Sequence, residues 1–216
     1  MALAAALLAV AFAAGPVEAR KKIRDATNPS ALIATEIAFN RMAQERGQWT
    51  AFRKFAAEDA VMFVPEAVNA PDWLKGRADP PSSVVWQPHE VWMSCDGTLG
   101  ATRGAWQRPD GSTGYFTTIW QRQKNESYKW VMDQGDGLAT PLAAPELIAG
   151  RIADCRRKPG APPAQQSIDG QVSTGMSIDG TLSWQVAVKP DSGRHVVVSY
   201  WDGSQWQSVI DASVKP

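Results

Sequence analysis

The sequence predicts an α+β protein in which helices pack on a curved antiparallel sheet, with a small β appendage towards the C-terminus. A segment of helical period occupies residues 28–46, and runs of strand character divided by turn residues follow over 84–133. A second group of alternating runs lies beyond a Pro-rich stretch, in 167–214. A chain of 216 residues can form one substantial domain with a smaller appendage and a true hydrophobic core.

The first 19 residues are typical of a secretory signal peptide. Leu3 to Ala14 is apolar throughout, Gly15 and Pro16 break this run, and small residues precede Arg20. The apolar run is shorter than the roughly 20 residues that a membrane-spanning helix needs. We therefore expect cleavage after residue 19, a periplasmic or secreted location, and no membrane insertion of the mature chain.

A long helix is predicted from Asn28 to about Arg46. Asn28 suits the N-cap, Pro29 suits the first helical position, and Gly47 can adopt the left-handed conformation that ends a helix. Apolar side chains recur at roughly helical spacing in this segment, at Leu32, Ile33, Ile37, Phe39 and Met42.

Shorter elements follow the long helix. We expect a second helix at 50–57, a strand at 61–64 that Pro65 ends, and a helical turn at 71–74. The later strands should form an antiparallel meander, because Asp-Gly pairs supply the positive backbone angles that tight hairpins need. The strands are expected at 84–94, 98–107, 114–123 and 128–133.

The turn at Asp110-Gly111 fixes a testable register. A two-residue hairpin there places Trp106 opposite Tyr115 and puts Trp106 and Trp120 on different faces of the sheet. The domain of helices and meander is expected to cover residues 28–136.

The rest of the chain is predicted to be a linker followed by a small module. Residues 137–166 read as a linker rich in Ala and Pro, with a short helix from Glu146 to Cys155. Residues 167–214 read as a small antiparallel β module that docks on the core domain. Asp179-Gly-Thr-Leu in this module repeats Asp96-Gly-Thr-Leu. A shared preference for Asp-Gly turns explains this repetition as well as duplication of a segment does.

Cys95 and Cys155 are the two cysteines of the chain. In an exported protein, a pair of thiols usually forms a disulfide, and the alternative is two buried free thiols. A bridge closes 155 minus 95, or 60, residues, for which chain entropy gives about 4 kcal/mol of stabilisation.

Charge and motifs exclude several classes of function. Lys plus Arg and Asp plus Glu each number 22, so the chain lacks the basic surface of a nucleic-acid-binding protein. Neither His89 nor His195 has a carboxylate at metal-ligand spacing, and no phosphate loop or nucleophile elbow is present. We therefore expect no metal and no cofactor.

The order of long helix, short helix, short strand, loop and long hairpins resembles the nuclear-transport-factor-2-like superfamily. This superfamily includes ketosteroid isomerases, polyketide cyclases and many uncharacterised exported proteins. The strongest local match is Gly47 to Pro65, and the resemblance covers about residues 28–136. It implies a cystatin-like half-cone whose concave face forms a cavity, and it supports a fold better than an activity.

Two positions depart from the isomerase pattern. The family's general base, just before the proline of the first strand, corresponds to Val64, and its oxyanion-hole tyrosine corresponds to Asn40. Both departures count against isomerase chemistry. Members that hydrate or dehydrate use paired carboxylates, or Asp with His, inside the cavity. The catalytic candidates here are Asp133, His89 and Asp59.

Ten tryptophans indicate either a ligand pocket or a densely filled core. The residues predicted to line a pocket lie on the meander and on the long helix. They are Asn40, Trp86, Trp106, Tyr115 and Trp120.

Three functions remain open on this basis. The first is an exported protein that binds a small apolar or aromatic ligand, and the second is a small-molecule lyase or isomerase with a pocket carboxylate. The third is a non-catalytic interaction module that forms a homodimer through its sheet. An acid such as Asp133 that faces the cavity beside a donor favours the enzyme. A packed cavity with an exposed apolar face favours the interaction module.

Overall fold

Helix α1, Pro29–Arg46, begins where the sequence predicts it. In the computed structural model, which describes residues 27–164 and 170–215, the Asn28 side chain accepts the Ser30 N–H at 2.9 Å. Gly47, at φ 106°, joins α1 directly to helix α2, Gln48–Phe55. The predicted signal segment 1–19 lies outside the described residues.

A seven-stranded sheet forms the centre of the protein, in the order β2-β1-β6-β5-β4-β3-β7. Strands β3 to β6 are the predicted antiparallel meander, whereas β1 pairs with β6 and β7 pairs with β3 in parallel. The short helix α3, Ala70–Leu74, matches the predicted helical turn. The strands are β1 (Ala56–Phe63), β2 (Ala67–Asn69), β3 (Val85–Met93), β4 (Leu99–Gln107), β5 (Thr113–Arg122), β6 (Tyr128–Leu138) and β7 (Ala149–Ile152).

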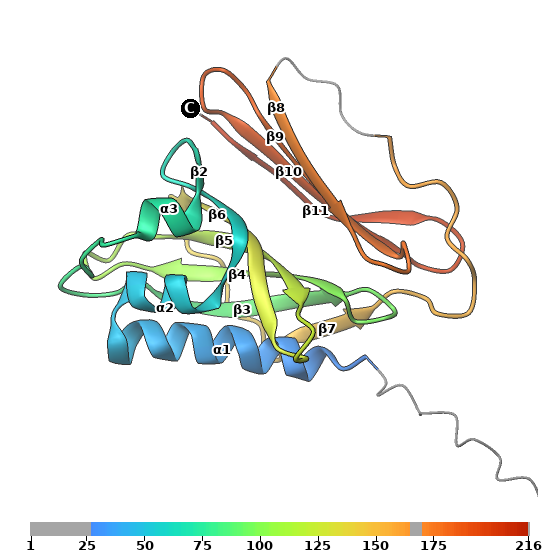
Figure 1. Ribbon diagram of the computed structural model, residues 1–216, viewed down its shortest axis with the longest axis horizontal. Helices are drawn as coiled ribbons and strands as arrows, with labels where there is room; N and C mark the ends of the chain where they lie inside the picture. Colours follow the sequence, from blue (N-terminus) through green and yellow to red (C-terminus); the bar gives the residue numbers. More distant parts are fainter. Residues whose placement is uncertain (1–26, 165–169, 216) are drawn as a thin grey trace, which may run out of the picture.

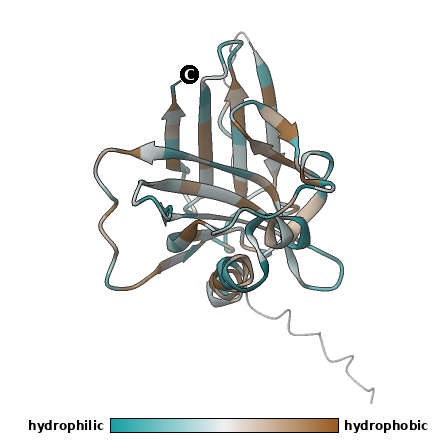
Figure 2. Ribbon diagram, turned by 90° about the vertical axis from the view of Figure 1, so that its left-hand side faces the viewer, coloured by the Kyte–Doolittle hydropathy of each residue, from teal (hydrophilic) through white to brown (hydrophobic). Residues whose placement is uncertain are grey.

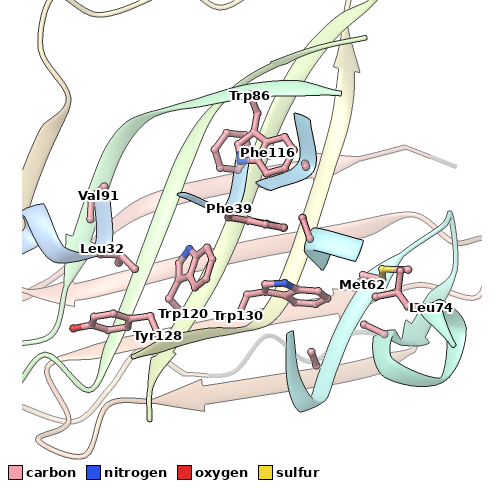
Figure 3. Packing of buried hydrophobic residues seen from close by; sticks show 14 of the residues in the cluster. Leu32, Phe39, Met62, Leu74, Trp86, Val91, Phe116, Trp120, Tyr128 and Trp130 are labelled. Carbon is pink, nitrogen blue, oxygen red and sulfur yellow. The ribbon is translucent and has the colours of Figure 1, made fainter. Parts of the chain in front are cut away.

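Helices α1 and α2 cover one face of this sheet, its concave side, and α3 lies beside β1 and β2 (Figure 1). Phe39 of α1 lies at the centre of an aromatic cluster between the two layers (Figure 3). Its ring centroid is 4.8 Å from that of Trp86 and 4.9 Å from that of Phe52, both in edge-on contact. The predicted α+β class, with helices on a curved sheet, is confirmed, although the sheet is mixed at its two ends.

A second sheet covers the opposite face, so the protein has three layers (Figure 1). Its order is β11-β10-β9-β8, and all its pairs are antiparallel. Figure 2 shows its strands running across those of the central sheet. Apolar residues from both sheets, among them Ile119, Met132, Leu182 and Val198, form one buried cluster. The strands are β8 (Gln171–Met176), β9 (Leu182–Val188), β10 (Arg194–Trp201) and β11 (Trp206–Val214).

The helix predicted from Glu146 to Cys155 is not formed. The segment instead contains β7, which adds to the free edge of β3 with Glu90 opposite Ala149. Gly150 lies so close to α1 that a Cβ atom there would be 2.7 Å from Pro29. Hydrogen bonding at an open sheet edge therefore overrides a weak local helix pattern.

The register predicted at Asp110-Gly111 is wrong by one residue. Trp106 pairs with Gly114 rather than with Tyr115, because the hairpin closes by a 2.8 Å bond from the Arg108 N–H to the Ser112 carbonyl. Three residues therefore form the loop, with Gly111 at φ 85°. A shift of one residue reverses the faces, so Trp106 and Trp120 share the concave face and Tyr115 lies on the other.

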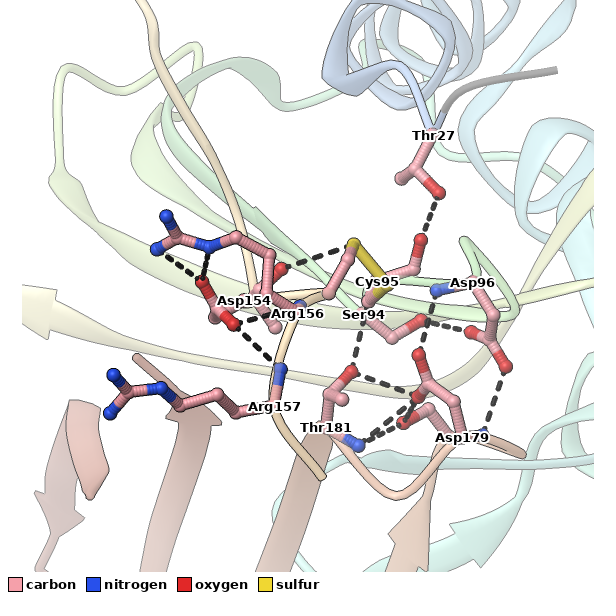
Figure 4. Close-up of a disulfide and its surroundings, with 12 residues drawn as sticks. Thr27, Ser94, Cys95, Asp96, Asp154, Arg156, Arg157, Asp179 and Thr181 are labelled. Carbon is pink, nitrogen blue, oxygen red and sulfur yellow. Dashed lines mark hydrogen bonds and ion pairs between the residues drawn. A yellow bond between two sulfur atoms is a disulfide. The ribbon is translucent and has the colours of Figure 1, made fainter. Parts of the chain in front are cut away.

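The two Asp-Gly-Thr-Leu turns meet where the two sheets come together (Figure 4). Residues 94–99 and 177–182 read Ser-Cys-Asp-Gly-Thr-Leu and Ser-Ile-Asp-Gly-Thr-Leu. Each turn has the same internal bonds: the aspartate accepts from the serine hydroxyl at 2.7 Å and from the threonine hydroxyl at 2.8 Å. The two segments are therefore structurally equivalent.

The contacts between these turns are reciprocal, as in a local two-fold axis. The Asp96 N–H donates to Asp179 Oδ2 at 2.8 Å, and the Asp179 N–H donates to Asp96 Oδ2 at 3.0 Å. The Cys95 N–H likewise donates to Thr181 Oγ1 at 2.9 Å. The predicted disulfide between Cys95 and Cys155 adjoins this contact, which we call the paired turns.

The paired turns should contribute measurably to docking of the second sheet. Asp179→Ala removes the acceptor for the Asp96 N–H as well as the internal bonds of its own turn. It should therefore lower the free energy of unfolding, measured by urea denaturation, by about 2 kcal/mol. Asp110→Ala is the matched control, because Asp110 accepts similar local bonds from Ser112 in an exposed hairpin without touching the second sheet. Equal losses in the two variants would contradict a docking role.

Candidate functional site

A cavity of about 410 Å³ opens on the concave side of the central sheet, between the sheet and helices α1 and α2. Seven of the 18 lining residues are aromatic, and polar side chains come from α2, β5 and β6 and from Arg108, which follows β4. The lining residues are Phe39, Gln48, Trp49, Phe52, Met62, Phe63, Val64, Val84, Trp86, Trp106, Arg108, Phe116, Thr118, Asp133, Gln134, Gly135, Asp136 and Gly137.

Two glycines allow Trp106 to lie close against the sheet. A Cβ atom at Gly114 would be 2.2 Å from the indole ring, and one at Gly135 would be 3.3 Å from the indole nitrogen. The Trp106 Nε1–H donates to the Tyr115 carbonyl at 2.9 Å, which fixes the ring. Larger residues at these two positions would displace one wall of the cavity.

Asp133 is the carboxyl group on the sheet side of the cavity that faces a hydroxyl donor. It lies opposite Thr118 in the β5–β6 pair, and the Thr118 hydroxyl donates to its Oδ2 at 2.7 Å. Burial raises the pKa of Asp133 from 3.8 to about 7. The Thr118 bond and the positive charge of Arg194 oppose this rise, whereas the negative charge of Glu36 adds to it.

Glu36 lies behind the cavity and is 0% exposed. It accepts hydrogen bonds from three neutral donors on three strands: Trp86 Nε1 at 2.7 Å, Thr102 Oγ1 at 2.6 Å and Trp120 Nε1 at 3.0 Å. Burial raises its pKa to about 7, and these three bonds oppose the rise. Glu36 thereby joins α1 to β3, β4 and β5, and it fixes Trp86, which forms a wall of the cavity.

The sequence analysis missed Glu36, although a signal for it exists. The buried face of α1 consists of Leu32, Glu36, Phe39 and Ala43. Their spacing of four, three and four is that of one helical face, so Glu36 occupies an apolar position in the stripe. An acid at such a position implies buried donors nearby, and tryptophans are a ready source of them.

The predicted pocket residues are divided among three places. Trp86 and Trp106 line the cavity. Asn40 lies behind it and accepts the Trp86 backbone N–H at 3.3 Å, and Trp120 is fully buried against Glu36. Tyr115 was wrongly placed in the pocket, because the one-residue change in register turns it to the face beneath the second sheet.

The three catalytic candidates do not come together. Asp133 lines the cavity, but neither His89 nor Asp59 does. His89 borders a separate recess with Glu90 and Arg103, and burial lowers its pKa. Asp59 is exposed on β1. Asp133 therefore has Thr118 as its polar partner and Glu36 as the nearby acid, a pair that the sequence did not suggest.

The site offers proton exchange and hydrogen bonding from its own side chains. Within residues 27–164 and 170–215, no group of three or more His, Cys, Asp or Glu side chains is arranged to hold a metal ion. A carboxyl group with a pKa near 7 can donate a proton or accept one near neutral pH.

Comparisons with known proteins found similarity among solved structures. No protein-family model and no curated protein matches the chain. A "putative ketosteroid isomerase" from Parabacteroides distasonis aligns at 11% identity over 54% of this chain and 97% of its own, with a TM-score of 0.42. A protein of unknown function with a cystatin-like fold from Methylobium petroleophilum aligns at 10% identity over 55% and 82%, with a TM-score of 0.38.

A third structure is an NTF2-like protein of unknown function from Mesorhizobium loti, at 16% identity over 52% of this chain and 96% of its own, with a TM-score of 0.33. Two of these structures are described as NTF2-like or as having a cystatin-like fold, in agreement with the superfamily that the sequence resembles. Each solved structure matches about half of this chain. At such identities and TM-scores, these likenesses say nothing about substrates.

The burial of Glu36 should appear as a pH-dependent loss of stability. Glu36 ionises in the unfolded chain as the pH rises through 4.5 but stays protonated in the folded protein until about pH 7. Its stabilising contribution is therefore complete below pH 4.5 and is lost between pH 4.5 and 7. At about 1.4 kcal/mol per pKa unit, the wild type should lose up to about 3 kcal/mol relative to Glu36→Gln across this range.

Urea denaturation at pH 4.5, 5.5, 6.5 and 7.5 measures this difference between the two proteins. Subtracting one curve from the other removes the contributions of titrating groups that do not interact with Glu36, such as His89. Glu45→Gln, at an exposed position of the same helix, is the control and should follow the wild type at every pH. Parallel curves for the wild type and Glu36→Gln would show that Glu36 ionises normally.

Proposed function

We propose that the protein binds a small apolar or aromatic molecule in the concave cavity, with one polar group of the ligand directed at Asp133. The observation that carries this proposal is an aromatic-walled cavity of about 410 Å³ with a carboxyl group on its sheet side. This volume is within the range of about 300–1,000 Å³ usual for small-molecule sites. Flat ligands would stack on Trp86 or Trp106, and Asp133 would set their orientation.

A lyase or isomerase activity is the second candidate, and the geometry of Asp133 favours it. The carboxyl group faces the cavity beside a hydroxyl donor, and its pKa of about 7 suits a general acid or base. In this reading Asp133 moves the proton, and Thr118 holds the carboxyl in place. Val64 occupies the position of the isomerase base, so the reaction would depend on Asp133 instead.

The dimeric interaction module receives less support. The outer face of the central sheet, through which such a dimer would form, is packed against the protein's own second sheet. A homodimer through that face would require the second sheet to move away.

Export is part of the proposal, because the disulfide between Cys95 and Cys155 is typical of oxidising compartments. Within the described residues, no helix is long and apolar enough to span a membrane.

A thermal-shift screen of residues 20–216 with planar aromatic ketones, phenols and amines tests ligand binding. A compound that binds in the cavity should raise the melting temperature and change tryptophan fluorescence, because Trp49, Trp86 and Trp106 line the wall. Trp106→Ala should weaken the binding of such a compound about tenfold or more through loss of stacking area. Asp59→Asn, on the exposed surface of β1, should bind as the wild type does.

Asp133→Asn then separates the binding protein from the enzyme. The amide keeps the size of the side chain but cannot exchange a proton near neutral pH. An enzyme should retain ligand affinity within a few-fold and lose turnover by about 100-fold or more. A binding protein should show no turnover in either form. The absence of any ligand in the screen, together with unchanged fluorescence, would count against both functions.

A further inference from the structure

Arg194 is a buried cation that the second sheet directs at the central sheet. It occupies an inward-facing position of β10, in the same alternating row as Val196 and Val198, and is 6% exposed. Burying a guanidinium group among apolar neighbours is costly unless its donors and its charge are used. The contacts of Arg194 therefore indicate what the group does there.

The hydrogen bonds and the ring contact of Arg194 on the central sheet involve residues that line the cavity. Its Nη2 donates to the Gly135 carbonyl at 2.6 Å, and its Nε donates to Gln134 Oε1 at 3.3 Å. The guanidinium carbon lies 4.8 Å from the centre of the Phe63 ring. Gly135, Gln134 and Phe63 belong to the end of β1 and to β6, which form one side of the cavity.

The charge of Arg194 also acts on the acids of the cavity. It interacts electrostatically with Asp133 and Asp136, both of which line the cavity, and with Tyr115 on the outer face. The charged groups that act on Asp133 are Glu36 from α1 and Arg194 from β10. Arg103 of β4 lies on the outer face as well, where its guanidinium carbon is 5.3 Å from the centre of the Tyr115 ring.

We propose that Arg194 is a positioning residue of the cavity: it holds the β6 wall from behind and keeps a positive charge behind Asp133. The second sheet is then part of the functional site rather than a separate appendage. This assignment deepens the proposed use of the cavity and rests on it. A merely structural arginine would hold the sheets together without setting the ionisation of Asp133.

The test is the ionisation of Asp133 in the ligand-free protein. Protein labelled with ¹³C at the aspartate carboxyl carbons is titrated by NMR, and the Asp133 signal is assigned by its loss in Asp133→Asn. Arg194→Met removes both the charge and the donors, Arg194→Gln removes the charge but keeps a donor, and Arg194→Lys keeps the charge. Arg103→Met is the matched control, because it removes a cation from the same face of the sheet.

The expected result is a rise of about half a pKa unit or more for Asp133 in Arg194→Met and Arg194→Gln. Arg194→Lys should remain near the wild type, and so should Arg103→Met. If Arg194→Met does not fold, Arg194→Gln supplies the same comparison. An unchanged Asp133 titration in Arg194→Gln, or an equal shift in Arg103→Met, would overturn the proposal. Because no ligand takes part, this result is independent of whether the screen finds one.

Discussion

The hydrogen bonds to Glu36 are the interaction on which the rest of the structure depends. One carboxyl group on α1 accepts donors from β3, β4 and β5, so a single buried acid fixes the helix over three strands of the meander. It occupies a position of the helical stripe that an apolar side chain would normally fill. Such a network is favourable only when every donor is used, and it specifies one arrangement of helix and sheet. The same bonds hold Trp86 at the cavity and place a second acid near Asp133.

The two faces of the central sheet differ in what they contact: one forms the cavity, and the other packs against the second sheet. On the concave face, Gly114 and Gly135 leave room for Trp106, and the space between the sheet and α2 stays open. On the outer face, Ile119 and Met132 are covered by the second sheet, which the paired turns hold beside β3 and β4. Arg194 connects the two faces, since it belongs to the outer layer but contacts the wall of the cavity.

Local chemistry predicted most of the elements and little of the site. Asn28, Pro29 and Gly47 place the ends of α1 correctly because capping is decided by neighbouring residues. The predicted register of Trp106 was wrong because Asp-Gly turns occur in hairpin loops of two or three residues, and the sequence alone does not distinguish the two lengths. The strand β7 was not predicted because it pairs with the edge of β3, which is formed by residues some sixty positions earlier. Asp133 was identified as a candidate, but its partners, Thr118 and Glu36, come from two other elements that only the fold brings together.

The most direct test of the Glu36 interaction is the pH dependence of the tryptophan indole N–H signals in ¹⁵N NMR spectra. The Trp86 and Trp120 signals should shift together with a midpoint near pH 7, as Glu36 ionises. In Glu36→Gln, neither signal should show this pH-dependent shift. The Trp106 signal, which is bonded to a backbone carbonyl, should move little. Independent behaviour of Trp86 and Trp120, or no titration between pH 5 and 9, would show that Glu36 does not join the helix to the sheet.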